Sequence, residues 1–194
     1  MNNELDKAAH HEAGHILITY FTGYTCEKVV LNANANGDAC TVQNYGDDLI
    51  LITAITNSKI MPEMFNGLPK EIKKFTPVVA HKAANVLLAG TVCESIYMNN
   101  GIIDGNMSVD LSGEDLIRVE QIDFLLKTIF PQHDPNFIQV LMTDLFTFFS
   151  HDEFEMATAA LVSGMKTAPN YTMDRKEIET ILKKTGFLDF LATL

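Results

Sequence analysis

The spacing of apolar and polar residues predicts a chain that is mostly helical. Strong helix formers followed by apolar residues predict a helix from about residue 4 to about residue 22. A second helix is predicted over 78–98, where the density of Ala, Val and Leu indicates burial on most sides. Residues 47–58 are apolar without a clean period, and a helix is favoured there. Further helices are predicted over 112–130, 136–149, 151–167 and 173–185.

One short β-hairpin interrupts this helical pattern. Residues 27–31 and 39–43 have the composition of two short strands. The segment 32–38 between them is rich in turn formers and contains Asn36-Gly37, which is a strong hairpin signal. The expected fold class is therefore mainly α, of the α+β type, with one small β-hairpin.

Proline and glycine mark the breaks between these elements. Two prolines and a glycine favour an irregular loop over 61–70, and glycine and asparagine favour a loop over 99–110. Pro131 is predicted to end the helix before it. Gly186 is predicted to end the last long helix, and a short apolar tail follows it.

The composition excludes several classes of function. A length of 194 residues suits one domain, and 47% hydrophobic residues allow a sizeable core. The net charge of −11 disfavours nucleic acid or an anionic membrane surface as the main partner. We expect no membrane span and no signal peptide, because no apolar run has the required length or flanks. Cys26, Cys40 and Cys93 show no C-x-x-C spacing, so buried free thiols and a cytoplasmic location are expected.

The most informative residues lie inside the first predicted helix. Residues 11–15 read His-Glu-Ala-Gly-His, which is an H-E-x-x-H motif. On a helix His11 and His15 share a face, so both imidazoles can bind one metal ion. Glu12 lies beside them, where it can take a proton from a metal-activated water. The motif is short and also occurs by chance, but the helical context and the small neighbouring residues favour a metal site.

A catalytic zinc needs a third protein ligand, which must come from a distant element. Asp115 lies on the apolar stripe of its predicted helix, where a carboxylate is costly unless it is paired or binds metal. The same residue can complete a capping box with Ser112. Glu94 is the rival, either as a ligand or as the group that orients a zinc-binding histidine. His81 is a further candidate, although a lone histidine there is more often a core residue. From the residues alone these alternatives stay open.

Around these residues the chain resembles the peptidase domain of FtsH-type ATP-dependent zinc metalloproteases. Residues 8–17, Ala-Ala-His-His-Glu-Ala-Gly-His-Ile-Leu, are similar to the family's Tyr-His-Glu-Ala-Gly-His-Ala. Residues 87–96 are similar to its Leu-Leu-Gly-Gly-Arg-Ala-Ala-Glu-Glu-Leu helix, and residues 114–119 to its Asn-Asp-Leu-Glu-Arg-Ala. Residues 27–31 and 173–182 resemble the strand after the motif and the closing helix, so the matches follow the family's order.

The resemblance implies roles for five residues. His11, His15 and Asp115 would bind zinc, and Glu12 would be the general base. Glu94 stands where the family has a glutamate that is not a ligand. This favours a role for Glu94 in orienting a histidine rather than in binding the metal.

The resemblance also implies a fold and a function. We expect a single zincin-like metallopeptidase domain over 1–194, with the zinc motif in about 1–110 and a C-terminal helical bundle in about 111–194. The expected activity is that of a zinc-dependent metalloendopeptidase acting on peptides or unfolded protein. The sequence has no G-x-x-x-x-G-K-[ST] loop, so we expect no ATP hydrolysis by that route. The spacing to Asp115 is longer than in the family, with extra sequence over about 49–74.

The sequence leaves two other interpretations of the function open. The chain can be a non-catalytic zinc- or protein-binding module with a peptidase-like fold, working with a separate ATPase. It can also be a helical domain in which the motif arose by chance. A homo-oligomer is a further expectation for either of the first two readings.

Overall fold

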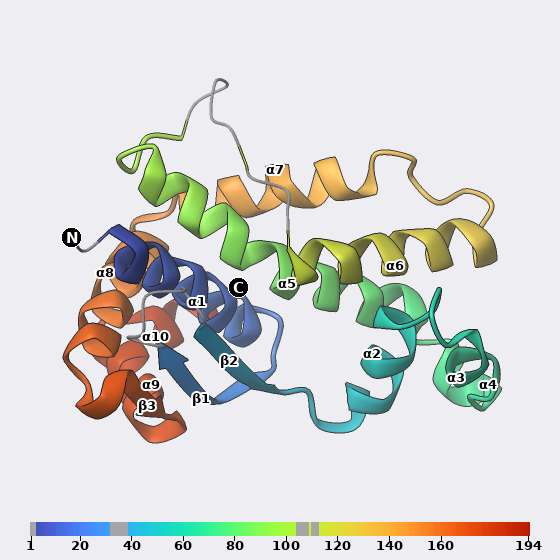
Figure 1. Ribbon diagram of the computed structural model, residues 1–194, viewed down its shortest axis with the longest axis horizontal. Coiled ribbons are helices and arrows are strands. Elements are labelled where there is room, and N and C mark those ends of the chain that lie inside the picture. The colour runs from blue at the N-terminus through green and yellow to red at the C-terminus, as the bar shows by residue number, and fades with distance from the viewer. Residues whose placement is uncertain (1–2, 32–38, 104–108, 110–112) are drawn as a thin grey trace.

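The computed structural model describes residues 3–31, 39–103, 109 and 113–194. Helices dominate this part of the chain, and its strands form one antiparallel sheet in the order β2-β1-β3 (Figure 1). The strands are β1 (Thr25–Leu31), β2 (Ala39–Asn44) and β3 (Thr172–Asp174). The predicted fold class, mainly α of the α+β type with a small hairpin, is confirmed.

The α-helices of the described residues cover most of the ranges that the sequence predicts. In chain order they are α1 (Asn3–Phe21), α2 (Leu49–Thr56), α3 (Pro62–Asn66), α4 (Lys70–Lys73), α5 (Thr76–Met98), α6 (Glu114–Ile129), α7 (Phe137–Phe149), α8 (Asp152–Thr167), α9 (Arg175–Lys184) and α10 (Phe187–Leu191). The apolar tail thus forms α10, and Gly186 ends α9 in the left-handed conformation, with φ +76°. The helix favoured over 47–58 is present as α2.

α1 is the central element of the fold. Every residue from 12 to 19 is buried, because α5, α8 and the β1–β2 hairpin all pack against this helix (Figure 1). Its contact with α5 is unusually close. A β-carbon at Gly14 would lie 2.3 Å from the carbonyl oxygen of Ala89. Glycine and alanine at this crossing therefore let the two helix backbones approach each other.

The sheet contains one strand that the sequence does not predict. β3 pairs with β1 through Lys28–Asp174, Val29–Met173 and Val30–Thr172. The helix predicted over 173–185 therefore begins two residues too early. Asp174 is extended and caps α9, since its carboxylate accepts from the backbone N–H of Glu177 in a capping box.

The prediction of an irregular loop over 61–70 is wrong. This segment contains α3 and the start of α4, and Figure 1 shows both at one end of the molecule, beyond α2. Pro62 is in the first turn of α3, where a helix tolerates the missing N–H. Pro69 precedes α4 as its N-cap. The prolines therefore begin short helices here instead of preventing them.

Some predictions fall on residues outside the described part of the chain. These are the hairpin turn at 32–38, half of the loop at 99–110 and the cap at Ser112. Cys26 and Cys93 are buried free thiols, but Cys40 is exposed. None of the described helices combines the length and the apolar character needed to cross a membrane.

Candidate metal centre

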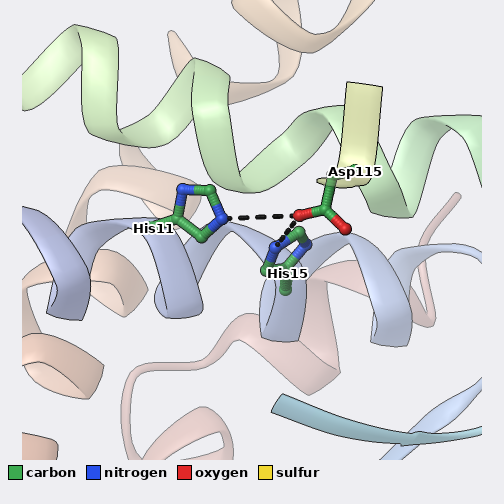
Figure 2. Close-up of side chains that lie close together, drawn as sticks. All are labelled: His11, His15 and Asp115. Atoms are coloured by element: carbon green, nitrogen blue, oxygen red, sulfur yellow. Dashed lines mark ion pairs between the residues drawn. The ribbon is translucent and has the colours of Figure 1, made fainter. Parts of the chain in front are cut away.

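His11 and His15 of α1 meet Asp115, which lies in the first turn of α6. The Oδ2 atom of Asp115 lies 3.5 Å from Nε2 of His11 and 3.1 Å from Nε2 of His15 (Figure 2). The three potential ligand atoms all lie within 4.8 Å of one another. The two histidines are one helical turn apart, whereas Asp115 is 100 positions after His15 in the chain. The structure thus brings together the three residues named as ligands from the sequence.

The spacing of these atoms suits one small divalent cation. Zinc bonds of about 2.0–2.2 Å in a tetrahedron place neighbouring ligand atoms about 3.3 Å apart. The separations of 3.1 and 3.5 Å lie on either side of that value. Two histidines and one carboxylate are a donor set of catalytic zinc sites, and ferrous iron also accepts it. The residues present therefore fit a metal, without selecting zinc by geometry alone.

The other nitrogen of each histidine is held by an acceptor. Nδ1 of His15 donates to the carbonyl oxygen of Val86 at 2.7 Å, and Nδ1 of His11 lies 3.1 Å from Oε2 of Glu94. An acceptor at Nδ1 fixes the ring and leaves the Nε2 lone pair for a metal. Glu94 thus contacts His11 and is not one of the three clustered residues, and its role in orienting that histidine stays a prediction.

Gly90 of α5 faces both imidazoles across the site. A β-carbon at this position would lie 2.5 Å from Nε2 of His15 and 2.7 Å from Nε2 of His11. The space that a metal would need is thus kept open by the absence of a side chain. The sequence signal for this role is weak, because a glycine inside an apolar helix indicates close packing of some kind but not against what.

Without a bound metal, a proton on His11 pairs with the carboxylate of Asp115. Burial lowers the pKa of His11, but its hydrogen bonds to Asp115 and Glu94 outweigh this and raise the pKa to about 9. Burial raises the pKa of Asp115, but the two histidines outweigh this and hold it well below its usual range. The pair is thus an imidazolium and a carboxylate at neutral pH, and a cation would replace the proton between them.

Glu12 is buried next to the histidines and is held by the sheet. Its side chain is 4% exposed, and its Oε2 atom accepts a hydrogen bond of 2.5 Å from the hydroxyl of Thr41 in β2. This contact fixes a carboxylate beside the ligand cluster without using it as a ligand. Thr41 was not singled out from the sequence, because only the folded hairpin brings it to α1.

One cleft of about 980 Å³ is lined by His11, Glu12, His15 and Asp115. Its walls come from α1, β2, α2, α5 and α6, and the lining residues beyond the cluster include Cys40, Gln43, Tyr45, Ile52, Thr56, Ile60, Leu87, Ile117, Arg118 and Gln121. Among the described strands, β2 pairs only with β1, so its other edge is unpaired there, and Ala39, Cys40, Thr41 and Gln43 of this strand line the cleft. An extended peptide can add to such an edge.

Tyr45 also lines this cleft. Burial, followed by the negative charge of Asp115, raises the pKa of Tyr45 to about 12. The phenol therefore stays protonated at neutral pH and can act as a hydrogen-bond donor. Tyr45 follows β2 directly, and no sequence pattern indicated its position in the cleft.

The other histidines considered lie elsewhere. His81 is exposed, with its ring edge against Phe137, so the expectation of a core histidine is wrong. His10 contacts the carbonyl of Asp6 and stacks on Tyr97. Neither belongs to the cluster of potential ligands found among the described residues.

No protein-family model matches the chain, and no curated protein matches it either. The likeness to FtsH-type peptidases therefore rests on the motif residues alone and stays a prediction.

Proposed function

We propose that this protein is a zinc-dependent metalloendopeptidase. The observation that carries the proposal is the convergence of His11, His15 and Asp115 beside the buried carboxylate of Glu12, in a cleft lined by β2, whose second edge is unpaired among the described strands. A ligand cluster alone would suit many metal proteins. A non-ligand glutamate next to it is what hydrolysis requires, and it favours zinc over a redox metal.

The residues have separate tasks in this proposal. Zinc held by His11, His15 and Asp115 would supply Lewis acidity, polarising the scissile carbonyl and lowering the pKa of water. Glu12 accepts the proton of the attacking water and delivers it to the leaving amine. The hydrogen bond from Thr41 holds the Glu12 carboxylate in place for both transfers. Tyr45 donates to the oxyanion that forms when the carbonyl is attacked.

The substrates proposed are peptides and unfolded proteins. Main-chain hydrogen bonds to the edge of β2 need an extended substrate backbone, which a folded protein rarely offers. The buried free thiols Cys26 and Cys93 suit a reducing compartment, so a cytoplasmic site of action is part of the proposal. A separate ATPase partner would supply unfolded chains.

The test compares the purified protein with its Glu12→Gln variant. We expect about one zinc per chain in both, chelator-sensitive cleavage of casein by the wild type, and a loss of at least about 100-fold in the variant. Glu155→Gln, an exposed change of the same kind on α8, is the matched control and should cleave normally. A zinc-loaded Glu12→Gln protein that cleaves casein at the wild-type rate would contradict proton transfer by Glu12. Stoichiometric zinc without any cleavage by the wild type would favour the non-catalytic module instead.

A further inference from the structure

One lobe of the molecule combines exposed apolar side chains with lysines. The lobe consists of residues 59–78, which include α3, α4 and the first turn of α5, and Figure 1 shows α3 and α4 at one end of the molecule. Large apolar side chains of this lobe are between 37% and 67% exposed, namely Ile60, Met61, Met64, Phe75 and Val78. Apolar side chains that gather on one part of a surface mark an interaction site.

The two short helices of the lobe each turn one side toward the core. In α3 the ring of Phe65 is buried, and in α4 the side chain of Ile72 packs against the buried core. Met61 and Met64, three residues apart, stay exposed at α3, and Lys70 stays exposed on α4. The exposed side chains thus belong to the outer side of the lobe.

A row of exposed side chains runs from α4 into α5. Lys70, Lys74 and Val78 follow one another at intervals of four residues. The backbone N–H of Lys74 donates to the carbonyl of Lys70 at 3.2 Å, so the chain stays close to helical here, and residues four apart are neighbours on its surface. The ammonium of Lys74 lies 4.9 Å from the centre of the exposed Phe75 ring. Charged and apolar groups are therefore adjacent on this face.

The charge of the lobe is opposite to that of the whole chain. The chain has a net charge of −11, whereas residues 59–78 hold more lysines than glutamates, namely Lys59, Lys70, Lys73 and Lys74 against Glu63 and Glu71. An anionic surface would attract this end of the molecule and repel the acidic remainder, which favours one orientation. The net charge alone disfavours an anionic membrane, but the distribution of the charge does not.

The kind of cation in the lobe favours lipid over protein as its partner. Its basic residues are all lysines, while Arg118 and Arg175 lie on α6 and α9. Protein–protein interfaces are enriched in arginine and depleted in lysine. Lysine suits a lipid surface, because its apolar stem can lie against the acyl chains while the ammonium reaches the headgroups.

We propose that this lobe docks on an anionic lipid membrane. The lysines contact the charged headgroups, while Phe75 and Val78 enter the boundary between the headgroups and the acyl chains. Ile60 belongs both to the lobe and to the lining of the metal-site cleft, so docking brings that cleft close to the lipid surface. The inference is independent of the proposed peptidase function, since no residue of the lobe is a potential metal ligand or proton acceptor there.

The experiment measures how the whole chain binds to vesicles, by co-sedimentation. One preparation is phosphatidylcholine alone, and the other is equal parts of phosphatidylcholine and phosphatidylserine. We expect the wild type to bind the mixed vesicles at least about tenfold more tightly than the neutral ones, and less tightly at high salt. Equal binding to both preparations, or no binding to either, would overturn the proposal. This comparison needs no variant.

Two pairs of charge reversals locate the binding surface. Lys70→Glu combined with Lys74→Glu should weaken binding to the mixed vesicles by at least about tenfold. Lys176→Glu combined with Lys183→Glu is the matched control, because it changes the net charge equally at exposed positions of α9, which Figure 1 shows at the other end of the molecule. It should weaken binding by no more than about twofold. An equal loss in both double variants would contradict docking through the lobe.

The apolar contribution is tested with one methyl-bearing side chain. Val78→Ser should weaken binding to the mixed vesicles by about threefold or more, because it removes an apolar group that enters the lipid. Val140→Ser, the same substitution at an exposed position of α7, should bind like the wild type. Wild-type binding by Val78→Ser would contradict insertion of this face.

An acidic protein is the rival partner, and the same variants distinguish it. The probe is immobilised poly-glutamate. Retention of the wild type but not of Lys70→Glu combined with Lys74→Glu, without binding to the mixed vesicles, would overturn the lipid and assign the lobe to an acidic protein.

Discussion

A β-carbon at Gly90 would lie 2.5 Å from the Nε2 atom of His15. No ordinary side-chain carbon can approach a ring nitrogen that closely, so the two helices that carry these residues depend on glycine at this crossing. The same β-carbon would meet Nε2 of His11 at 2.7 Å. Gly90 therefore shapes the space beside both metal-facing atoms, although it offers no ligand itself.

Gly90→Ala should weaken zinc binding by at least about tenfold. The added methyl would push one or both imidazoles away from Asp115, and a shift of a few tenths of an ångström removes a zinc bond. Zinc affinity is measured by competition with a fluorescent chelator. Gly164→Ala is the control, because its β-carbon would meet the end of the Ile181 side chain and the sulfur of Met173, which can move. Unchanged affinity in Gly90→Ala would contradict this account.

Glu94→Gln should also weaken zinc binding, by about 10–100-fold. The substitution keeps the size of the side chain and an acceptor oxygen for Nδ1 of His11, but it removes the charge that makes the imidazole a better ligand. The same competition assay measures the effect. Glu120→Gln, at an exposed position of α6, should bind zinc like the wild type. A larger loss, with no zinc bound at all, would instead indicate that Glu94 is itself a ligand.

The apparent affinity for zinc should rise with pH between 6 and 8, by up to tenfold per unit. In the metal-free protein the pKa of His11 is raised to about 9, so a proton occupies the imidazole throughout this range and has to leave when zinc binds. The chelator competition repeated at several pH values gives the slope. An affinity independent of pH would show that the imidazole is already free.

The stability of the metal-free protein should change in the opposite direction. The pKa of His11 is raised from the ordinary 6.5 to about 9, so its protonated form stabilises the fold. This contribution to the free energy of unfolding is fully present below pH 6.5 and is lost as the pH rises through about 9. We expect the free energy of unfolding in chelator to fall by about 2 kcal/mol between pH 6.5 and 9. His11→Ala should show a flatter profile over the same range, and an equally steep one would assign the loss to other groups.

Gly14→Ala should destabilise the metal-free protein by about 1–3 kcal/mol. Its β-carbon would lie 2.3 Å from the carbonyl oxygen of Ala89, and backbone inside a helix cannot yield as a side chain can. Urea unfolding in the presence of chelator measures this separately from zinc binding. Gly164→Ala should remain close to the wild type, and equal stability of both variants would mean that α1 and α5 can separate without cost.

The sequence was most informative where the chemistry depends on one helix. His11, Glu12 and His15 follow from a spacing of four residues, and the structure adds only where the side chains point. Asp115 is different, because its place beside the histidines depends on α6 packing against α5, which brings its first turn next to α1, and no local pattern encodes this contact. Spacing left Asp115 and Glu94 as alternatives, and the geometry separates them, since Asp115 faces Nε2 and Glu94 faces Nδ1.

The features that the sequence missed share one physical cause. β3 is three residues long and is extended because β1 pairs with it, while its own residues continue a helical pattern. Thr41 and Tyr45 enter the site through the packing of β2 and α2 around α1 and α6. The prolines near α3 were misleading because proline disfavours only the interior of a helix and not its first turn.

Asp115 lies in the first turn of α6, and this position gives a bound metal a mechanical role. Zinc would fasten the first turn of α6 to α1 and so hold together two residues that are 100 positions apart, which stabilises the folded chain. Removal of zinc would release this turn of α6, and amide hydrogen exchange there should speed up before exchange in α1 does. Zinc supply would then control the shape of the cleft as well as its reactivity.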